Sequence, residues 1–285
     1  MSAATTFKTW ESAVRWLRDQ PAQRELVLAA YYDDPLIDAA TRYWRSEEWQ
    51  AVRALLPAGG GRALDVGAGR GIASFALAKE GYTVTALEPD ASALVGAAAI
   101  RDLARTSGLA IEVTQEFSER LPFADAQFDV LFARAVLHHT SDLAAACREF
   151  CRVLKPGGRL IAVREHVISR AQDLPVFLDL HPLHKLYGGE NAFELSAYEA
   201  AIRSAGLNLE LVLAPFDSAI NYAPHTLDSL HQELAARVAR KLPGTGPALR
   251  WLLGLPPVWA LARRVLTRLD DRPGRHYSFV ARRPS

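Results

Sequence analysis

The sequence predicts an α/β fold built on a mainly parallel sheet. Three observations carry this prediction: apolar runs alternate with helical stretches, a glycine-rich loop follows the first apolar run, and an acid ends the second. Lys and Arg number 33 against 32 acids, so the net charge of +1 gives no field that would attract nucleic acid. We find no secretory signal pattern and no 18-residue apolar span, so we expect a soluble, cytoplasmic protein without a nucleic-acid partner.

The glycine-rich loop occupies residues 63–71, Ala-Leu-Asp-Val-Gly-Ala-Gly-Arg-Gly. This pattern predicts a buried strand, a tight turn and a helix over residues 72–80, followed by a second strand over residues 82–87 that ends at Glu88. Glycine lets a ligand approach bare main chain, and a helix start offers unpaired N–H groups. An acid after the second strand can accept hydrogen bonds from both ribose hydroxyls. We therefore predict a nucleoside site made by the following residues: Asp65, Gly67, Ala68, Gly69, Gly71 and Glu88. A close helix contact is the competing role for Gly71.

The spacing of the loop decides between two kinds of nucleoside. A dinucleotide loop reads Gly-x-Gly-x-x-Gly, and its last glycine would fall at position 72, which is Ile72. Asp65 would also repel a pyrophosphate, whereas a carboxylate suits a ligand with a positive end. An NAD-dependent oxidoreductase is therefore disfavoured, and the loop favours a donor such as S-adenosylmethionine (SAM).

Further motifs follow the loop in order: Leu-Pro-Phe at residues 121–123, Phe-Asp-Val at 128–130, Leu-His-His at 137–139 and Arg-Val-Leu-Lys-Pro-Gly-Gly-Arg-Leu at 152–160. With the loop they resemble the class I SAM-dependent methyltransferases, in particular the small-molecule enzymes of ubiquinone and menaquinone biosynthesis, over residues 62–167. The resemblance implies a Rossmann-like, seven-stranded, mostly parallel sheet with an antiparallel last strand, and SAM as cofactor. It also implies that Ala133 and Arg134 lie near the methionine end. Phe117 replaces the usual adenine-binding acid, so we expect Phe117 and the backbone of Ser118 to contact adenine.

The remaining elements follow from periodicity and breakers. Helices over residues 7–17, 21–32 and 36–56 would form an N-terminal cap, residues 1–58, before a SAM-binding domain over residues 59–285. The cap would cover the cofactor, or its aromatics would simply pack on the sheet. Further helices are expected over residues 91–106, 142–154 and 196–205. Further strands are expected over residues 111–114, 128–133, 159–164, 207–213 and 276–281.

Two segments lie outside this core. Residues 169–195 are loop-like and rich in polar side chains, including His181, His184, Tyr187 and Glu190, so we predict a lid that contacts the acceptor. A His-x-x-His pair without a third close ligand is poor evidence for a metal, and we expect none. Residues 224–272 form a helical insertion whose apolar and basic stretch 248–269 would lie on a membrane surface, hold a lipid-linked acceptor, or pack on the domain or in a homodimer. The chain would be a monomer or a homodimer.

Methyl transfer from a sulfonium is an in-line displacement, and an oxygen acceptor must also lose a proton. Histidine is the usual base, and the candidates are His138, His139, His166, His181 and His184. Of these we favour His181 and His166. The leading hypothesis is therefore a SAM-dependent methyltransferase acting on an oxygen atom of a small-molecule or lipid-linked acceptor. A catalytically silent protein that binds SAM is the alternative.

Overall fold

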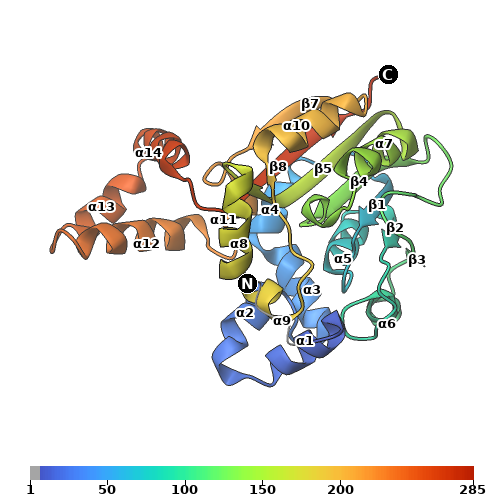
Figure 1. The fold of residues 1–285 in the computed structure, drawn as a ribbon, viewed down its shortest axis with the longest axis horizontal. Coiled ribbons are helices and arrows are strands. Elements are labelled where there is room, and N and C mark those ends of the chain that lie inside the picture. Colours follow the sequence, from blue (N-terminus) through green and yellow to red (C-terminus); the bar gives the residue numbers. More distant parts are fainter. Residues whose placement is uncertain (1–6) are drawn as a thin grey trace.

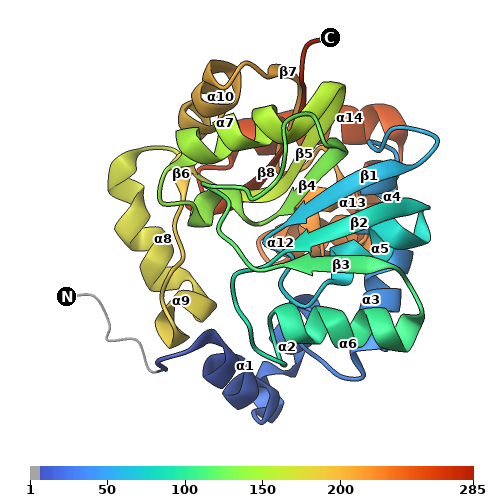
Figure 2. The ribbon, with the colours of Figure 1, turned by 90° about the vertical axis from the view of Figure 1, so that its right-hand side faces the viewer.

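A computed structural model describes residues 7–285 and contains a mixed sheet (Figures 1 and 2). Along the sheet the strand order is β3-β2-β1-β4-β5-β8-β7. The strands are β1 (Gly61–Val66), β2 (Tyr82–Leu87), β3 (Ile111–Thr114), β4 (Phe128–Arg134), β5 (Leu154–Ile168), β7 (Asn208–Leu213) and β8 (Arg275–Arg282). β8 runs antiparallel to both β5 and β7, whereas β1 to β5 pair in parallel. The predicted seven-stranded sheet with an antiparallel last strand is confirmed. A two-residue strand, β6 (Phe193–Glu194), additionally pairs with the end of β5.

The sheet is covered on both faces, which explains why its central strand is apolar almost throughout. Along β4, Leu131 and Ala133 pack in one hydrophobic cluster, with α7 (Leu143–Val153) and α10 (Leu195–Ser204). The alternate residues Val130 and Phe132 pack in the other cluster. That second cluster contains α3 (Leu36–Arg45), α4 (Glu47–Arg53) and α5 (Ile72–Lys79). Alternation along one strand therefore builds two cores.

The N-terminal segment begins with α1 (Trp10–Arg18) and α2 (Arg24–Ala29), and its first six residues lie outside the described part of the chain. The single helix predicted over residues 36–56 is wrong, because Ser46 is extended and separates α3 from α4. The Oγ atom of Ser46 accepts a hydrogen bond from the Trp49 backbone N–H at 3.1 Å, so Ser46 caps α4. Tyr43 and Trp49 are fully buried, and Trp49 contacts Phe132 of the sheet. Both helices therefore belong to the core of the sheet.

Two other predicted boundaries differ from the structure. Helix α6 (Ala97–Ser107) begins six residues later than the helix predicted from residue 91. The preceding residues form a turn in which Asp90 Oδ1 accepts from the Ser92 N–H at 2.7 Å. β5 is much longer than the predicted strand over residues 159–164, because pairing with β8 resumes beyond Arg164, where the register shifts. This extension places Glu165 and His166 inside the sheet.

The segment over residues 169–195 is largely helical, which corrects the loop-like reading. It contains α8 (Leu174–Leu180) and α9 (Pro182–Leu186). The backbone N–H of Phe7 donates to the carbonyl of Leu186 at 2.9 Å, and the rings of Trp10 and Tyr187 lie 5.6 Å apart. The first helix of the chain therefore meets this segment directly.

Residues 219–269 form α11 (Ala219–Tyr222), α12 (Leu227–Ala239), α13 (Gly246–Leu253) and α14 (Pro256–Leu269). The last three helices project from the body as an arm, drawn in orange and red in Figure 1. The helical insertion predicted before the last strand is therefore present. Among residues 7–285, no helix combines the length and the apolar character that crossing a bilayer requires.

Candidate active site

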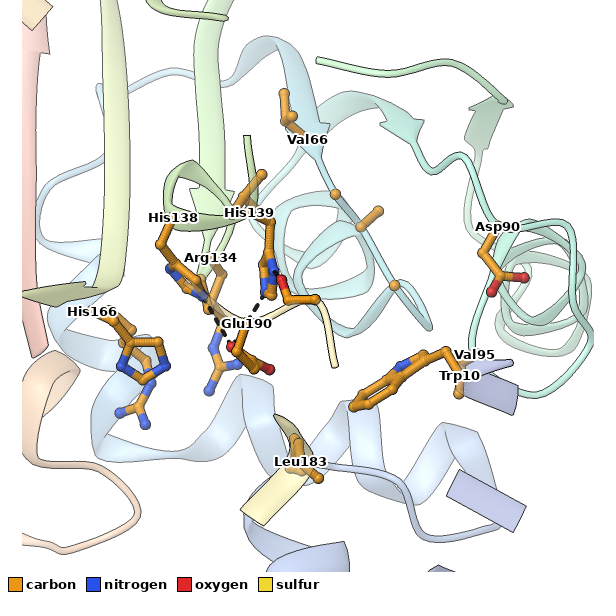
Figure 3. Close-up of a pocket in the computed structure, with 18 of the residues that line it drawn as sticks. Trp10, Val66, Asp90, Val95, Arg134, His138, His139, His166, Leu183 and Glu190 are labelled. Atoms are coloured by element: carbon orange, nitrogen blue, oxygen red, sulfur yellow. Dashed lines mark hydrogen bonds and ion pairs between the residues drawn. The ribbon is translucent and has the colours of Figure 1, made fainter. Parts of the chain in front are cut away.

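A cavity of about 950 Å³ lies at the carboxyl ends of β1, β2 and β4, where open α/β sheets bind ligands. Its floor includes the glycine loop, and residues of β5 and β8 line another side. Trp10 of α1 and Leu183 of α9 also line it (Figure 3). The cap and the α8–α9 segment, far apart in sequence, therefore enclose one space.

The three loop glycines have different roles. A Cβ on Gly67 would lie 2.7 Å from Val136, and one on Gly71 would lie 3.1 Å from Ile100 of α6, so both positions require close packing. A Cβ on Gly69 would meet no atom within 4 Å, although Gly69 has a φ of +54°. Gly69 lines the cavity, so this is where bare main chain faces the open space. The competing packing role for Gly71 is what the structure shows.

The acid after β2 lies against this loop. Glu88 Oε2 accepts a hydrogen bond from the Gly69 N–H at 2.7 Å, and its Oε1 accepts from the Asp90 N–H at 2.9 Å. Asp65 is buried at the end of β1, where its Oδ2 accepts from the Ser74 hydroxyl at 2.6 Å. Burial raises the pKa of both carboxyl groups to about 7. No Lys or Arg forms a salt bridge with either acid within residues 7–285. A cationic ligand close to these two groups would lower both pKa values and favour the ionised carboxylates.

Two arginines tie the site to the N-terminal helices. Arg70 is buried and donates to the carbonyls of Tyr31 and Asp33 at 2.8 and 2.9 Å. Arg134 forms a bidentate ion pair with the buried Glu48 of α4, at 2.7 and 3.1 Å. Arg134 lines the cavity as expected, but its guanidinium is already paired.

Of the other residues expected to bind the cofactor, three line the cavity and one does not. Phe117 and Ser118 line the cavity, and Phe117 is 66% exposed, so its ring is open to a stacking partner. Ala68 also lines the cavity, and its N–H donates to the Leu87 carbonyl at 3.0 Å. Ala133 is fully buried in the core and is absent from the cavity lining, because its side chain faces α7 rather than the pocket.

A cluster of histidines occupies the other end of the cavity (Figure 3). The cluster contains His138 and His139 of the Leu-His-His motif and His166 of β5. His181 at the start of α9 and Glu190 from the loop beyond α9 complete it. The expected His181 and His166 thus lie together, with ring centres 5.3 Å apart. His184 does not line the cavity.

Carboxylates organise the charge of this cluster. His138 Nδ1 lies 2.7 Å from Oε2 of Glu165, which is fully buried. Although burial acts in the opposite direction, the hydrogen bond to Glu165 and the nearby carboxylate of Glu190 raise the pKa of His138 to about 9. Although burial raises it, the neighbouring histidines lower the pKa of Glu190 to about 2. Burial and the charge of His138 lower the pKa of His166 to about 3, and burial also lowers that of His181.

Sequence reasoning missed the roles of Glu165 and Glu190. Glu165 lies just beyond the predicted end of the fifth strand, and only the longer β5 buries it beside His138. Glu190 is 52 residues from His138 in sequence, so no local spacing could have paired them. His276 of β8 also lines the cavity, and its Nδ1 lies 3.2 Å from the Asn221 carbonyl.

Comparisons with known proteins agree with this geometry. Residues 64–162 match the profile of the methyltransferase domain family. The chain is 33% identical over 177 residues to a ubiquinone biosynthesis O-methyltransferase from Xylella fastidiosa, covering 59% of this chain and 68% of that protein. It is 32% identical over 179 residues to the methyltransferase GfsG from Streptomyces halstedii, covering 62% of each. The chain therefore belongs to the class I SAM-dependent methyltransferases.

The match covers only part of several of these relatives. The chain spans 62% of GfsG and 47% of a demethylmenaquinone methyltransferase from Mycobacterium marinum. Among solved structures, the [4+2]-cyclase SpnF has the same fold, with a TM-score of 0.55, 24% identity and coverage of 87% of this chain and 82% of that one. A methyltransferase fold therefore also occurs in a protein named for another reaction.

The cavity fits SAM, the donor of this family. Gly69 lines the cavity without a side chain, and Glu88 next to it would accept hydrogen bonds from the ribose hydroxyls. Asp65, buried at the end of β1 with its pKa raised to about 7, would face the cationic end of the donor, whose charge would favour the ionised carboxylate.

Proposed function

We propose that this protein transfers the methyl group of SAM to an oxygen atom of a small-molecule acceptor. One observation carries the proposal: a single cavity is lined both by the glycine loop with Glu88 and by the histidine cluster. The first end suits a nucleoside, and the second offers groups that can hold a hydroxyl and accept its proton. SAM supplies the electrophilic methyl group, and the protein aligns the acceptor and excludes water.

The donor end would use the residues described above. Glu88 would accept from the ribose hydroxyls, the exposed ring of Phe117 would stack on adenine, and the backbone of Ser118 would contact the base edge. Asp65 would face the ammonium group of the methionine part. Arg134 would contribute through its backbone or by shaping the wall, because Glu48 already pairs with its guanidinium.

The acceptor end has two histidines with distinct hydrogen-bonding states. His166 Nδ1 lies 2.9 Å from the Gly274 carbonyl, which can only accept, so Nδ1 carries the hydrogen and Nε2 keeps a lone pair. His181 Nδ1 instead accepts from the His184 N–H at 3.3 Å, so the hydrogen of the neutral ring is on Nε2. We therefore assign proton acceptance to His166 and hydrogen-bond donation to His181.

Methyl transfer from radiolabelled SAM to phenols, catechols, sugars and a cell extract tests the proposal. We expect His166→Ala to lower kcat with unchanged SAM affinity, by at most about 10²-fold, the lower end of the general-base range, because the low pKa of His166 makes it a weak base. His225→Ala is the matched control, because His225 is an exposed histidine before α12 that does not line the cavity. SAM binding without transfer to any acceptor would instead indicate a silent SAM-binding protein or another reaction on this fold.

The surface of the arm suggests that the protein binds its acceptor at a membrane. On α14, Leu261, Val265 and Leu269 are exposed at four-residue spacing, and Arg264 and Arg268 are exposed beside them. An apolar stripe flanked by arginines suits the surface of an anionic bilayer. We therefore infer that a cytoplasmic enzyme contacts the membrane through residues 248–269 and takes a lipid-linked acceptor. Co-sedimentation with phosphatidylglycerol vesicles should fall for Leu261→Glu. Equal sedimentation of the native protein and Leu261→Glu would contradict membrane binding through the arm. If the arm instead forms a dimer interface, the mass of Leu261→Glu in solution would be half that of the native protein.

A further inference from the structure

Two carboxylates, Glu190 in the histidine cluster and Glu165 beside it, form no salt bridge with Lys or Arg within residues 7–285. Glu165 is fully buried and forms its only salt bridge within residues 7–285 with His138. In the same part of the chain, Glu190 is bridged only by His138, His139 and His181. Buried carboxylates are retained when they are paired or when they coordinate a metal. Two acids whose salt-bridge partners are all histidines can pair with a protonated His138, or can join the neutral imidazoles as ligands of a metal ion.

The tautomers of two histidines are set by their neighbours. Glu165 Oε2 accepts from the His138 backbone N–H at 3.1 Å and also lies 2.7 Å from His138 Nδ1. The Gly189 carbonyl lies 2.9 Å from His139 Nδ1. Because both oxygens are acceptors, each Nδ1 is the nitrogen that bears a hydrogen. In the neutral rings, the lone pairs therefore lie on the two Nε2 atoms.

Both Nε2 atoms point toward the same carboxylate oxygen. His138 Nε2 and His139 Nε2 each lie 3.7 Å from Glu190 Oε2, as the dashed lines in Figure 3 show. Three ligand atoms, one from each residue, lie within 4.8 Å of one another. Ligands of a tetrahedral ion with bonds near 2.0–2.1 Å are about 3.3 Å apart. An ion would therefore shorten each histidine–Glu190 distance by about 0.4 Å and the distance between the two imidazole nitrogens by at most about 1.5 Å.

We propose that His138, His139 and Glu190 bind a divalent transition-metal ion, of the zinc, manganese or iron(II) class, inside the acceptor end of the cavity. Two imidazoles and one carboxylate suit these ions rather than calcium or magnesium, which prefer oxygen ligands. Glu165 and the Gly189 carbonyl act as the outer partners that orient the imidazoles.

The second group around Glu190 extends the site. Ligand atoms of His166, His181 and Glu190 also lie within 4.8 Å of one another. His166 presents Nε2, since its Nδ1 faces the Gly274 carbonyl. The ion would therefore have open positions bordered by His166 and His181 in a cavity that also holds the donor site.

These open positions suggest the class of acceptor, an inference that rests on the proposed methyl transfer. A vicinal diol or catechol could bind the ion through both oxygens, and the ion would favour loss of the hydroxyl proton. The hydroxyl oxygen would then attack the methyl carbon as the carbon–sulfur bond breaks, and its proton would pass to His166.

Titration of the untagged, metal-free protein with Co²⁺ tests the site, because Co²⁺ in a four- or five-coordinate histidine site absorbs visible light. We expect one equivalent to bind, Zn²⁺ to displace it, and both Glu190→Gln and His139→Ala to weaken Co²⁺ binding roughly tenfold or more. His225→Ala removes an exposed histidine that precedes α12 and does not line the cavity, and this variant should bind Co²⁺ like the native protein. Circular dichroism and SAM titration would verify that each variant is folded.

Equal Co²⁺ affinity of the native protein and Glu190→Gln would overturn the proposal, because the carboxylate would then serve only as a counter-ion for the histidines. Methyl transfer is measured separately on the same samples. Metal binding without transfer to any acceptor would contradict the proposed function and leave the metal site standing. Transfer that continues with no metal bound and no effect of Glu190→Gln would overturn the proposed role of the ion in activating the acceptor.

Discussion

Replacing Gly69 with alanine tests whether the glycine loop holds the methyl donor. Gly69 has a φ of +54°, so a side chain there adopts a left-handed backbone conformation that costs about 1–2 kcal/mol. The new methyl group would meet no protein atom within 4 Å and would stand in the cavity where the nucleoside is expected. Blocking a main-chain contact should weaken SAM binding by about 1–3 kcal/mol, or roughly 5- to 150-fold.

Gly108 supplies a matched control for this substitution. It ends α6 with a φ of +69°, and a Cβ there would also meet nothing within 4 Å, but Gly108 does not line the cavity. Gly69→Ala and Gly108→Ala should therefore lower the melting temperature by similar amounts, about 2–4 °C for each kcal/mol. Calorimetric titration with SAM and S-adenosylhomocysteine should separate them, with only Gly69→Ala losing affinity. Native affinity in both variants would refute the proposed position of the donor.

Three further substitutions test the surroundings of the site. Burial raises the pKa of Glu88 to about 7, so the folded state binds more protons than the unfolded chain between about pH 4.5 and 7, and stability falls as pH rises through that window. Urea unfolding of Glu88→Gln should show a smaller fall between pH 5 and 8, and an unchanged pH profile would count against the buried acid. Glu48→Gln removes the charge that neutralises the Arg134 guanidinium, and its free energy of unfolding should fall by about 3–5 kcal/mol, whereas a loss below 1 kcal/mol would show the pair to be dispensable. Arg70→Ala removes two hydrogen bonds to the backbone of residues 31 and 33, so hydrogen exchange should accelerate in residues 24–34, and unchanged protection there would contradict the tether.

The sheet was predictable because its signals are local. Each apolar run, glycine turn and terminal acid lies within a few residues of the next, and pairing in a parallel sheet follows from that order. The same reasoning placed Glu88 directly after β2. It also showed that the spacing of the glycine loop around Gly69 differs from that of a dinucleotide-binding loop. At Ser46 two local signals conflict. The helical periodicity on both sides predicts one continuous helix, whereas the serine itself caps α4 and separates it from α3.

The acceptor end could not be predicted in the same way. Glu165 becomes a partner of His138 only because β8 extends the pairing of β5 beyond Arg164. Glu190 reaches the histidines through the fold of α8 and α9, a segment whose polar composition resembles that of a loop. Contacts across 27 and 52 residues depend on tertiary structure and leave no periodic trace in the sequence.

The burial of Tyr43 and Trp49 against the sheet has a consequence for engineering. A fragment starting at Gly59 would expose the apolar surface that these rings cover, and it would leave Arg70 and Arg134 without their partners. The first 58 residues are thus not an exchangeable module. A chimera that imports them from a relative would have to import the matching surface of α5 and β4 as well.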